Sequence, residues 1–310
     1  MRQVTVRCAV GPEPPLPVIV EAVEAGGGAV VGVDEADALI WTDPRDAGLL
    51  DLVLAGPAGD RLRWVQLPFA GVDAFLRLID AERVWTSTKG AYAEPVAEHA
   101  LALALAGLRG LTARARADAW GEPAGRRLMG GRVTIVGGGG IAAALIRLLA
   151  PFRVGVTVVR RSAGQPVEGA ARVVAGRDGL ASALPGADLV VIALPLTPET
   201  AGIIGAEELA AMDSHAWLVN VARGDHVDTD ALVAALRSGA IGGAALDVTS
   251  PEPLPAGHPL WSLDNCLITP HVANTWEMAL PLFAARVREN VRRWGAGEPP
   301  LGIVDPVLGY

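Results

Sequence analysis

The sequence is poor in several features that mark particular classes of protein. It has only two cysteines, Cys8 and Cys266, in 310 residues, too few for a disulfide framework or a cysteine-built metal site. Aromatic residues make up 5% of the chain, Lys89 is the only lysine, and the net charge is −8. This excess of negative charge argues against a protein that binds nucleic acid or an anionic membrane.

The sequence also lacks a long apolar run. The most apolar helical stretch, "HALALALAGLRGL" (99–111), is shorter than the roughly 20 residues that a membrane-spanning helix needs. The N-terminal "MRQVTVRCAVGPEPP" is interrupted by charge and proline before a signal-peptide core could form. Because 51% of the residues are hydrophobic, a sizeable buried core is expected. These features together predict a cytoplasmic globular protein.

The chain does contain a regular alternation of short β-rich runs and helical runs. In the first hundred residues we expect strands at 4–10, 38–41 and 62–67 and helices at 16–26 and 46–56. A long Ala/Leu-rich helix is expected over 93–120. From Arg132 the strands are continuous apolar runs, as in sheets covered on both faces, at 133–136, 156–159, 188–194, 216–220, 243–248 and 266–270.

This pattern predicts an α/β protein of two domains. The larger domain, residues 100–279, is expected to be a Rossmann-type, doubly wound parallel sheet that binds a dinucleotide. The smaller parallel α/β domain is expected to comprise residues 1–99. A last helix, 278–297, comes too late to belong to the larger sheet. We therefore expect residues 280–310 to complete the smaller domain.

Four consecutive glycines, Gly137 to Gly140, directly follow one of these strands and directly precede a helical stretch. A flexible linker would have polar, aperiodic neighbours. A glycine-rich turn between strand and helix instead lets the backbone approach a pyrophosphate at the helix N-terminus. The alternative is an ordinary strand–helix turn. Gly137 and Gly139 fill the first two motif positions and Ala142 the third, and the candidate cofactor-binding residues of this turn are Gly137, Gly139, Gly140 and Ile141.

The end of the next strand indicates which dinucleotide is bound. NAD sites place an acidic residue there to accept hydrogen bonds from the ribose, but this chain has Arg160, Arg161 and Ser162. Arginines and a hydroxyl would bind a 2′-phosphate through charge-assisted hydrogen bonds. The sequence therefore predicts NADP(H) rather than NAD(H), the alternative being two solvated arginines without that role.

Several segments, in this order along the chain, resemble the D-isomer-specific 2-hydroxyacid dehydrogenases. They are "LRWVQLPFAGVD" (62–73), "PVAEHALALALAGLRG" (95–110), residues 187–224, "LVNVARGDHVDTDALVAAL" (218–236), "GGAALDVTSPEPLP" (242–255) and "NCLITPHVANTW" (265–276). The resemblance implies a flavodoxin-like substrate domain and reversible reduction of a small 2-keto acid, of the glyoxylate or hydroxypyruvate type, to the D-2-hydroxy acid. With the Ala/Leu-rich helix, it also implies a homodimer.

The same resemblance implies roles for individual residues. Arg223 matches the arginine that binds the substrate's carboxylate and keto oxygen, Glu252 the acid that pairs with the catalytic histidine, and His271 the general acid/base. Asp247 resembles the residue that fixes the nicotinamide carboxamide. The remaining candidates are Ala70 and Gly71 for the substrate carboxylate and Leu194, Pro195, Thr200, Val221 and Ala222 for the cofactor.

The chemistry independently requires such a set of groups. When a 2-keto acid receives a hydride at carbon, its oxygen gains a proton, so an acid that titrates near neutral pH must lie at that oxygen. A neighbouring carboxylate stabilises the imidazolium form of a histidine. A planar, permanently charged guanidinium suits a carboxylate beside a developing alkoxide. Arg223, Glu252 and His271 each follow an expected strand. We therefore expect their side chains to meet at the carboxyl edge of a parallel sheet.

Other residues and other functions offer alternatives to this interpretation. We expect His99, His215, His226 and His258 to be structural or surface residues, and no spacing suggests a metal site. Trp276 could narrow the substrate pocket or pack at the domain hinge. One rival function is a nucleotide-sensing protein like the corepressor relatives of this family. The other is a formate dehydrogenase. The resemblance implies that the formate dehydrogenases related to this family carry glutamine at the position of Glu252.

Overall fold

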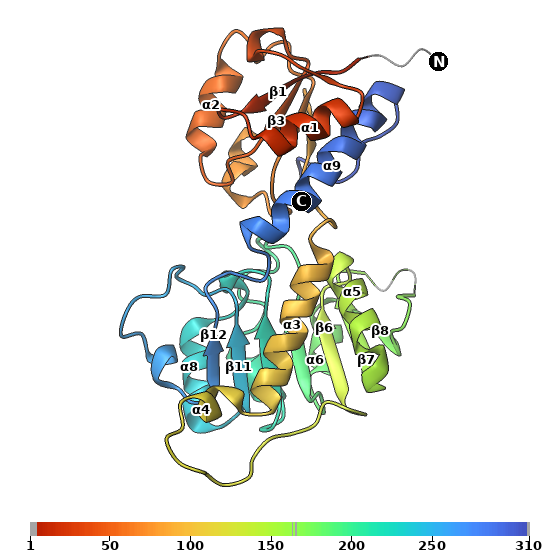
Figure 1. Cartoon of the computed structure of the whole chain (residues 1–310). Coiled ribbons are helices and arrows are strands. Elements are labelled where there is room, and N and C mark those ends of the chain that lie inside the picture. The colour runs from red at the N-terminus through yellow and green to blue at the C-terminus, as the bar shows by residue number, and fades with distance from the viewer. Residues whose placement is uncertain (1–4, 163, 165, 309–310) are drawn as a thin grey trace. The chain divides into compact units, whose positions relative to one another are not determined.

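Two compact units make up the chain in the computed structural model, which describes residues 5–162, 164 and 166–308 (Figure 1). Unit 1 comprises residues 1–92 and 275–310, and unit 2 comprises residues 93–274. The expected boundaries, after residues 99 and 279, lie a few residues beyond these. The division falls at 92/93 and 274/275 because each boundary helix belongs whole to one unit: α3 (Ala93–Leu108) packs on α5 (Gly140–Leu149), and α9 (Trp276–Ala296) packs on α1 (Pro17–Ala25).

Unit 1 is built on a parallel sheet that, in its described residues, has five strands in the order β2-β1-β3-β4-β5. Helices α1 and α9 contribute to the core on one face of this sheet, and α2 to the core on the other. The strand order is the flavodoxin-like one. The bounds are β1 (Arg7–Gly11), β2 (Ala29–Val30), β3 (Ala38–Trp41), α2 (Ala47–Ala55), β4 (Trp64–Gln66) and β5 (Val84–Thr86). The expected strand 4–10 begins at Val4, which lies outside the described residues.

The C-terminal helix is held to unit 1 by buried contacts. The ring of Trp294 stacks on that of Trp64, with 5.4 Å between centroids. Asn290, fully buried on α9, donates a hydrogen bond from Nδ2 to Oε1 of Gln66 at 2.8 Å. Leu301 donates its backbone N–H to Oδ1 of Asn290 at 2.7 Å. Burying these amides is favourable only because they find partners, so the C-terminal segment is an integral part of unit 1.

Unit 2 is the larger of the two and has a doubly wound parallel sheet. In its described residues the strand order is β12-β11-β10-β9-β6-β7-β8, which corresponds to the Rossmann order with a seventh strand added at one edge. The strands are β6 (Arg132–Val136), β7 (Gly155–Arg160), β8 (Arg172–Ala175), β9 (Leu189–Ile192), β10 (Trp217–Asn220), β11 (Gly243–Leu246) and β12 (Cys266–Ile268). The expected two-domain α/β fold is confirmed.

Helices cover both faces of the unit 2 sheet (Figure 1). Helices α3 and α5 bury their apolar residues in one core, and the other core takes residues from α6 (Gly176–Ala183), α7 (Ala206–Ala211) and α8 (Thr229–Ser238). Coverage of both faces explains why the strands are continuous apolar runs. Short 3₁₀ helices complete the two units at Val33–Glu35, Asp73–Leu78, Ala150–Phe152, Gly224–His226 and Pro259–Ser262.

The long helix expected over 93–120 is shorter in the structure. Helix α3 ends at Leu108, and a short α4 (Leu111–Ala115) follows after Gly110, whose φ of +61° takes the chain into the left-handed region. A left-handed residue ends a helix, and glycine adopts that conformation without strain. In the described part of the chain, no helix is both long and apolar enough to cross a membrane.

Candidate active site

The predicted residues of unit 2 follow strands that end at one row of its sheet. In the strand pairing, Val159, Val136, Ile192, Asn220, Leu246 and Ile268 lie side by side across the sheet. The segments that leave this row carry, in the same order, Arg160, Gly137, Leu194, Arg223, Asp247 and His271. All these strands are parallel, so the segments share one edge, the edge where open α/β sheets bind ligands.

In the glycine turn between β6 and α5, one glycine has no room for a side chain and another faces open space. Gly137 has φ +122°, and a Cβ built on it would lie 2.1 Å from the carbonyl oxygen of Ala193. Gly139 is the N-cap of α5 in extended backbone, and a Cβ there would meet nothing within 4 Å. Ala142 is fully buried, which agrees with close packing of helix and strand. The turn has the form of a backbone cradle at a helix N-terminus, which suits a pyrophosphate.

Arg160 lies directly beside this turn. A Cβ on Gly138 would lie 3.1 Å from Cδ of Arg160, so the arginine side chain runs over the second glycine of the run. Its Nε donates a hydrogen bond to the carbonyl oxygen of Ser162 at 2.8 Å. Arg161 and Ser162 are exposed. Two guanidinium groups and a hydroxyl therefore lie at the end of β7, in the position where an NAD site places a carboxylate.

The segment after β9 is closed by its own hydrogen bonds. Thr200 donates from Oγ1 to the carbonyl oxygen of Pro195 at 2.8 Å, and Oγ1 of Thr200 in turn accepts the backbone N–H of Thr197 at 2.8 Å. Pro195 is exposed, whereas Leu194 is half-buried. The hydroxyl of Thr200 thus shapes the loop that presents Leu194 and Pro195 at the sheet edge.

The backbone of the segment that carries Arg223 is held by a buried histidine, His226. Val221 and Ala222 are buried. Nδ1 of the fully buried His226 lies 3.2 Å from the backbone nitrogen and 3.0 Å from the carbonyl oxygen of Arg223, and Nε2 lies 3.3 Å from the carbonyl oxygen of Pro195. Burial lowers the pKa of His226 and keeps the ring neutral. We expected His226 to be a structural or surface residue. It is a buried structural residue that contacts the two loops carrying Pro195 and Arg223.

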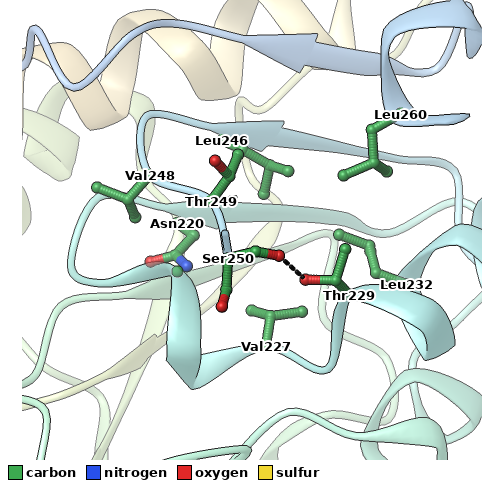
Figure 2. Close-up of a pocket in the computed structure, with 10 residues that line it drawn as sticks. Asn220, Val227, Thr229, Leu232, Leu246, Val248, Thr249, Ser250 and Leu260 are labelled. Carbon is green, nitrogen blue, oxygen red and sulfur yellow. Dashed lines mark hydrogen bonds between the residues drawn. The ribbon is translucent and has the colours of Figure 1, made fainter. Parts of the chain in front are cut away.

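Gly224, which belongs to no glycine motif, is also required at this site. A Cβ on Gly224 would lie 2.0 Å from the carbonyl carbon and oxygen of Thr249. The segment after β10 therefore touches the segment after β11 backbone to backbone. Thr229 adds a hydrogen bond from Oγ1 to the carbonyl oxygen of Ser250 at 2.7 Å, and Figure 2 shows this bond between two of the residues that line a small pocket. These contacts fix the loop that carries Glu252.

Asp247 lies immediately after β11 and binds the turn that carries His271. Its carboxylate accepts the backbone N–H groups of Val272 and Ala273, each at 2.9 Å, and its backbone carbonyl oxygen accepts the N–H of His271 at 2.8 Å. Burial, the largest influence, raises the pKa of Asp247, but hydrogen bonds from His99, Thr269, Val272 and Ala273 together hold the pKa below its ordinary value. Asp247 is an ionised, 2%-exposed anchor.

His271 and Glu252, the pair that the resemblance implies, lie in contact. Nδ1 of His271 lies 2.7 Å from Oε1 of Glu252, and the side chains are 49% and 41% exposed. The φ of His271 is +54°, a left-handed backbone that few residues other than glycine adopt. Because Nδ1 faces the carboxylate, Nε2 is the ring nitrogen left to exchange a proton with a ligand.

The candidates on unit 1 lie in a separate group. Ala70 and Gly71 follow β4 on the segment after Phe69. Trp276, the first residue of α9, packs edge-on against the ring of Phe69 with 6.1 Å between centroids, and Phe69 packs against Tyr92 in the same way at 6.0 Å. The Tyr92 hydroxyl donates to the carbonyl oxygen of Pro68 at 2.6 Å. Aromatic packing thus supports the segment that carries Ala70 and Gly71.

The remaining histidines differ in their surroundings. His215 lies with Nε2 3.1 Å from Oδ1 of Asp188, and Nδ1 of His258 accepts the N–H of Leu260 at 3.3 Å. His99, in contrast, contacts the residues that hold the His271 turn. In the part of the chain that the structure describes, His, Cys, Asp and Glu form no group of three or more suited to a metal ion.

Comparison with known families supports the interpretation of unit 2. A sequence profile described as "D-isomer specific 2-hydroxyacid dehydrogenase, NAD binding domain" matches residues 99–273. An uncharacterised protein of Corynebacterium melassecola is 41% identical over 81% of this chain and 84% of its own length. The glyoxylate reductase of Aeropyrum pernix is 34% identical over 87% of this chain and 83% of its own length. Glyoxylate/hydroxypyruvate reductase A of Yersinia enterocolitica is 36% identical, over only 57% of this chain and 56% of that enzyme.

Two solved structures extend the similarity to both units. A D-isomer-specific 2-hydroxyacid dehydrogenase from Xanthobacter autotrophicus Py2, in complex with NADPH and MES, is 32% identical with a TM-score of 0.84 and covers 99% of this chain and 100% of its own. An NADPH-dependent glyoxylate/hydroxypyruvate reductase from Sinorhizobium meliloti, in complex with NADP and sulfate, is 26% identical with a TM-score of 0.80 over 99% of this chain and 100% of its own.

Proposed function

The chain belongs to the D-isomer-specific 2-hydroxyacid dehydrogenase family, an oxidoreductase family, and we propose that it reduces a small 2-keto acid of the glyoxylate or hydroxypyruvate type with NADPH. The observation that carries this proposal is the 2.7 Å contact between Nδ1 of His271 and Oε1 of Glu252, at the sheet edge that also carries the glycine turn. Relatives named glyoxylate reductase and glyoxylate/hydroxypyruvate reductase support the choice of substrate class.

His271 is the general acid in this proposal. When bound, the nicotinamide would supply the hydride that reduces the keto carbon. Nε2 of His271 donates the proton that the keto oxygen gains, and Glu252 holds the ring through Nδ1 and stabilises its imidazolium form. In the reverse direction the neutral ring accepts that proton from the hydroxy acid.

Arg223 is the substrate-binding cation in this proposal. Its guanidinium binds the carboxylate and the keto oxygen as a planar fork and stabilises negative charge that develops on the oxygen. Its main chain is held by His226 and by packing of Val221 and Ala222, so the base of the side chain is fixed before a ligand binds. Such preorganisation lowers the cost of binding.

A substrate panel beside a His271 variant tests the catalytic role. We expect the purified protein to oxidise NADPH with glyoxylate, hydroxypyruvate or pyruvate, and His271→Ala to lower kcat by about 10³-fold, within the range for loss of a general acid. NADPH binding, followed by fluorescence titration, should be retained as a control. A His271→Ala variant with full kcat would overturn the proposal. A wild type that binds NADPH without turnover would favour the nucleotide sensor, and NADPH formation with formate would favour the formate dehydrogenase.

The cofactor preference rests on the end of β7. Arg160, Arg161 and Ser162 would bind the 2′-phosphate of NADPH, and the structures from Xanthobacter and Sinorhizobium contain NADPH and NADP. We expect kcat/KM to be higher with NADPH than with NADH, and Arg160→Ala or Arg161→Ala to lower the NADPH value about tenfold or more, the worth of a charge-assisted hydrogen bond. The NADH value of each variant is the control. Equal or better use of NADH by the wild type would refute this preference.

The homodimer also remains a proposal, and it rests on the resemblance to the family rather than on helix α3. The apolar residues of α3, including Ala97, Ala100, Leu103 and Ala104, are buried in the core of unit 2. An apolar helix that serves its own unit is no argument for a second subunit. Sedimentation equilibrium should give a mass of twice 32.0 kDa, and a monomer at micromolar concentration would contradict the dimer.

A further inference from the structure

His99 lies on α3, far along the chain from the residues it contacts. Its Nε2 is 3.1 Å from Oγ1 of Thr269 and 3.3 Å from Oδ1 of Asp247. The side chain is 21% exposed, whereas that of Asp247 is 1% exposed. All three residues belong to unit 2. A polar contact of this kind, largely removed from water, depends on each proton being in the right place.

The protons in this cluster can be placed from the distances. Oγ1 of Thr269 lies 2.6 Å from Oδ1 of Asp247, and the carboxylate is ionised, so the single hydroxyl proton of Thr269 points to Asp247. Oγ1 can then only accept a hydrogen bond from His99. His99 must therefore carry a proton on Nε2 and donate it to the pair formed by Thr269 and Asp247.

The same carboxylate holds the turn that presents His271. Besides Thr269 and His99, it binds the N–H groups of Val272 and Ala273. His271 itself has φ +54°, and a left-handed non-glycine residue persists only when its surroundings impose it. Any rotation of the Asp247 carboxylate would release one of these two N–H groups. The side chains of Thr269 and His99 contact Oδ1 of the same carboxylate and oppose that rotation.

We propose that His99 is a positioning residue, which acts through Thr269 and Asp247 to hold the backbone turn of His271. The inference rests on the proposed function in one respect, namely that His271 is the general acid/base. His99 thereby couples α3 to the end of β12, and the imidazole of His271 keeps its orientation toward Glu252 because the turn beneath it cannot relax.

Hydrogen exchange at two amides tests the positioning without any assay of activity. His99→Leu removes the donor and keeps an apolar side chain suited to a helix, whereas His99→Gln keeps an N–H donor at about the same distance from the backbone. We expect the amides of Val272 and Ala273, followed by NMR, to exchange about tenfold faster in His99→Leu, as after loss of a hydrogen bond, and near the wild-type rate in His99→Gln. His215→Leu, which removes the contact with Asp188, is the matched control and should leave both amides unchanged.

Steady-state kinetics test the consequence for catalysis. We expect His99→Leu to lower kcat about tenfold, because a small displacement of a catalytic group is costly, with little change in KM for the keto acid, and His99→Gln to recover most of kcat. If His99→Leu does not fold, Thr269→Val removes the bridging hydroxyl at nearly constant volume and should have the same effects. Unchanged exchange at both amides, or a kcat equal to that of His215→Leu, would overturn the inference. A wild type without keto-acid turnover would refute the proposed function alone, since the exchange result still decides whether His99 holds the turn.

Discussion

Two turns at the same edge of the unit 2 sheet both require a residue with positive φ, but they place different residue types there. The turn after β6 and the turn after β12 leave strands that end in one row, at Val136 and Ile268. Both contain a residue with positive φ: Gly137 at +122° and His271 at +54°. The first turn uses a residue without a side chain, and the second uses one whose side chain is proposed to do the chemistry.

The difference shows how each turn is stabilised. Glycine adopts positive φ without steric penalty, so the first turn needs no support from outside. A left-handed histidine costs about 1–2 kcal/mol. Two backbone N–H groups donate to the Asp247 carboxylate, and hydrogen bonds to a charged group contribute about 1.5–3 kcal/mol each. The support therefore exceeds the strain, and the side chain can be held where glycine would otherwise be required.

The largest effect is expected from adding a side chain to the first turn. Gly137→Ala would place a Cβ 2.1 Å from the Ala193 carbonyl oxygen at φ +122°, and should lower the free energy of unfolding of unit 2 by at least about 3 kcal/mol. Hydrogen exchange of the core amides of β6, without cofactor, measures this change.

Gly139→Ala is the matched control for Gly137→Ala. Its Cβ would meet nothing within 4 Å, so the free energy of unfolding should change by less than about 0.5 kcal/mol. The NADPH dissociation constant should nevertheless rise about tenfold or more, because the proposed pyrophosphate would approach that face. A Gly137→Ala protein as stable as Gly139→Ala would show that the first turn is no more constrained than its neighbour.

The second effect concerns the support of the His271 turn. Asp247→Asn replaces one acceptor oxygen by an NH₂ group that faces the N–H of a neighbouring residue, and should destabilise unit 2 by about 2 kcal/mol at pH 7. The pKa of Asp247 is lowered in the fold, so its ionisation stabilises the fold fully above about pH 4 and is lost as pH falls through the lowered value. The difference between wild type and Asp247→Asn should therefore shrink below pH 4. A difference that is constant from pH 7 to pH 3 would contradict an ionised anchor.

The smallest effect is expected from relieving the backbone strain of the left-handed residue His271. His271→Gly and His271→Ala both remove the imidazole, but only glycine relieves the left-handed backbone, so His271→Gly should be more stable by about 1 kcal/mol after allowance for its more flexible unfolded chain. Arg153 has the same φ of +54° and no predicted role in the site. Arg153→Gly and Arg153→Ala should differ by a similar amount, with activity unchanged. If only the Arg153 pair differs, the His271 turn carries no strain.

Most of the fold could be predicted from the sequence, because long apolar strands and glycine-terminated helices leave clear patterns. The strands that escaped prediction are β2, β5 and β8. Strand β2 has only two residues, β5 is directly preceded by the charged Glu82 and Arg83, and β8 is an edge strand that lies between polar segments. The long Ala/Leu-rich helix was overestimated because its composition continues past Gly110, where the backbone turns left-handed.

The candidate site could be predicted in its side chains more than in its supports. The resemblance to the family pairs His271 with Glu252, and the two side chains lie in contact. His99, His226 and Gly224 were not predicted as supports, because each acts on a segment that is distant in sequence or through backbone atoms. Neither a hydrogen bond from α3 to the end of β12 nor a backbone contact between two loops leaves a local pattern. Only the register of the parallel strands brings these residues together.

The return of α9 to unit 1 has a consequence for how the chain is made. Domains usually fold as they emerge from the ribosome, N-terminal part first. Unit 2 is one continuous stretch, whereas unit 1 needs Asn290 and Trp294 to complete its core. We therefore expect unit 2 to reach its native fold during translation, whereas unit 1 can do so only after α9 has been synthesised.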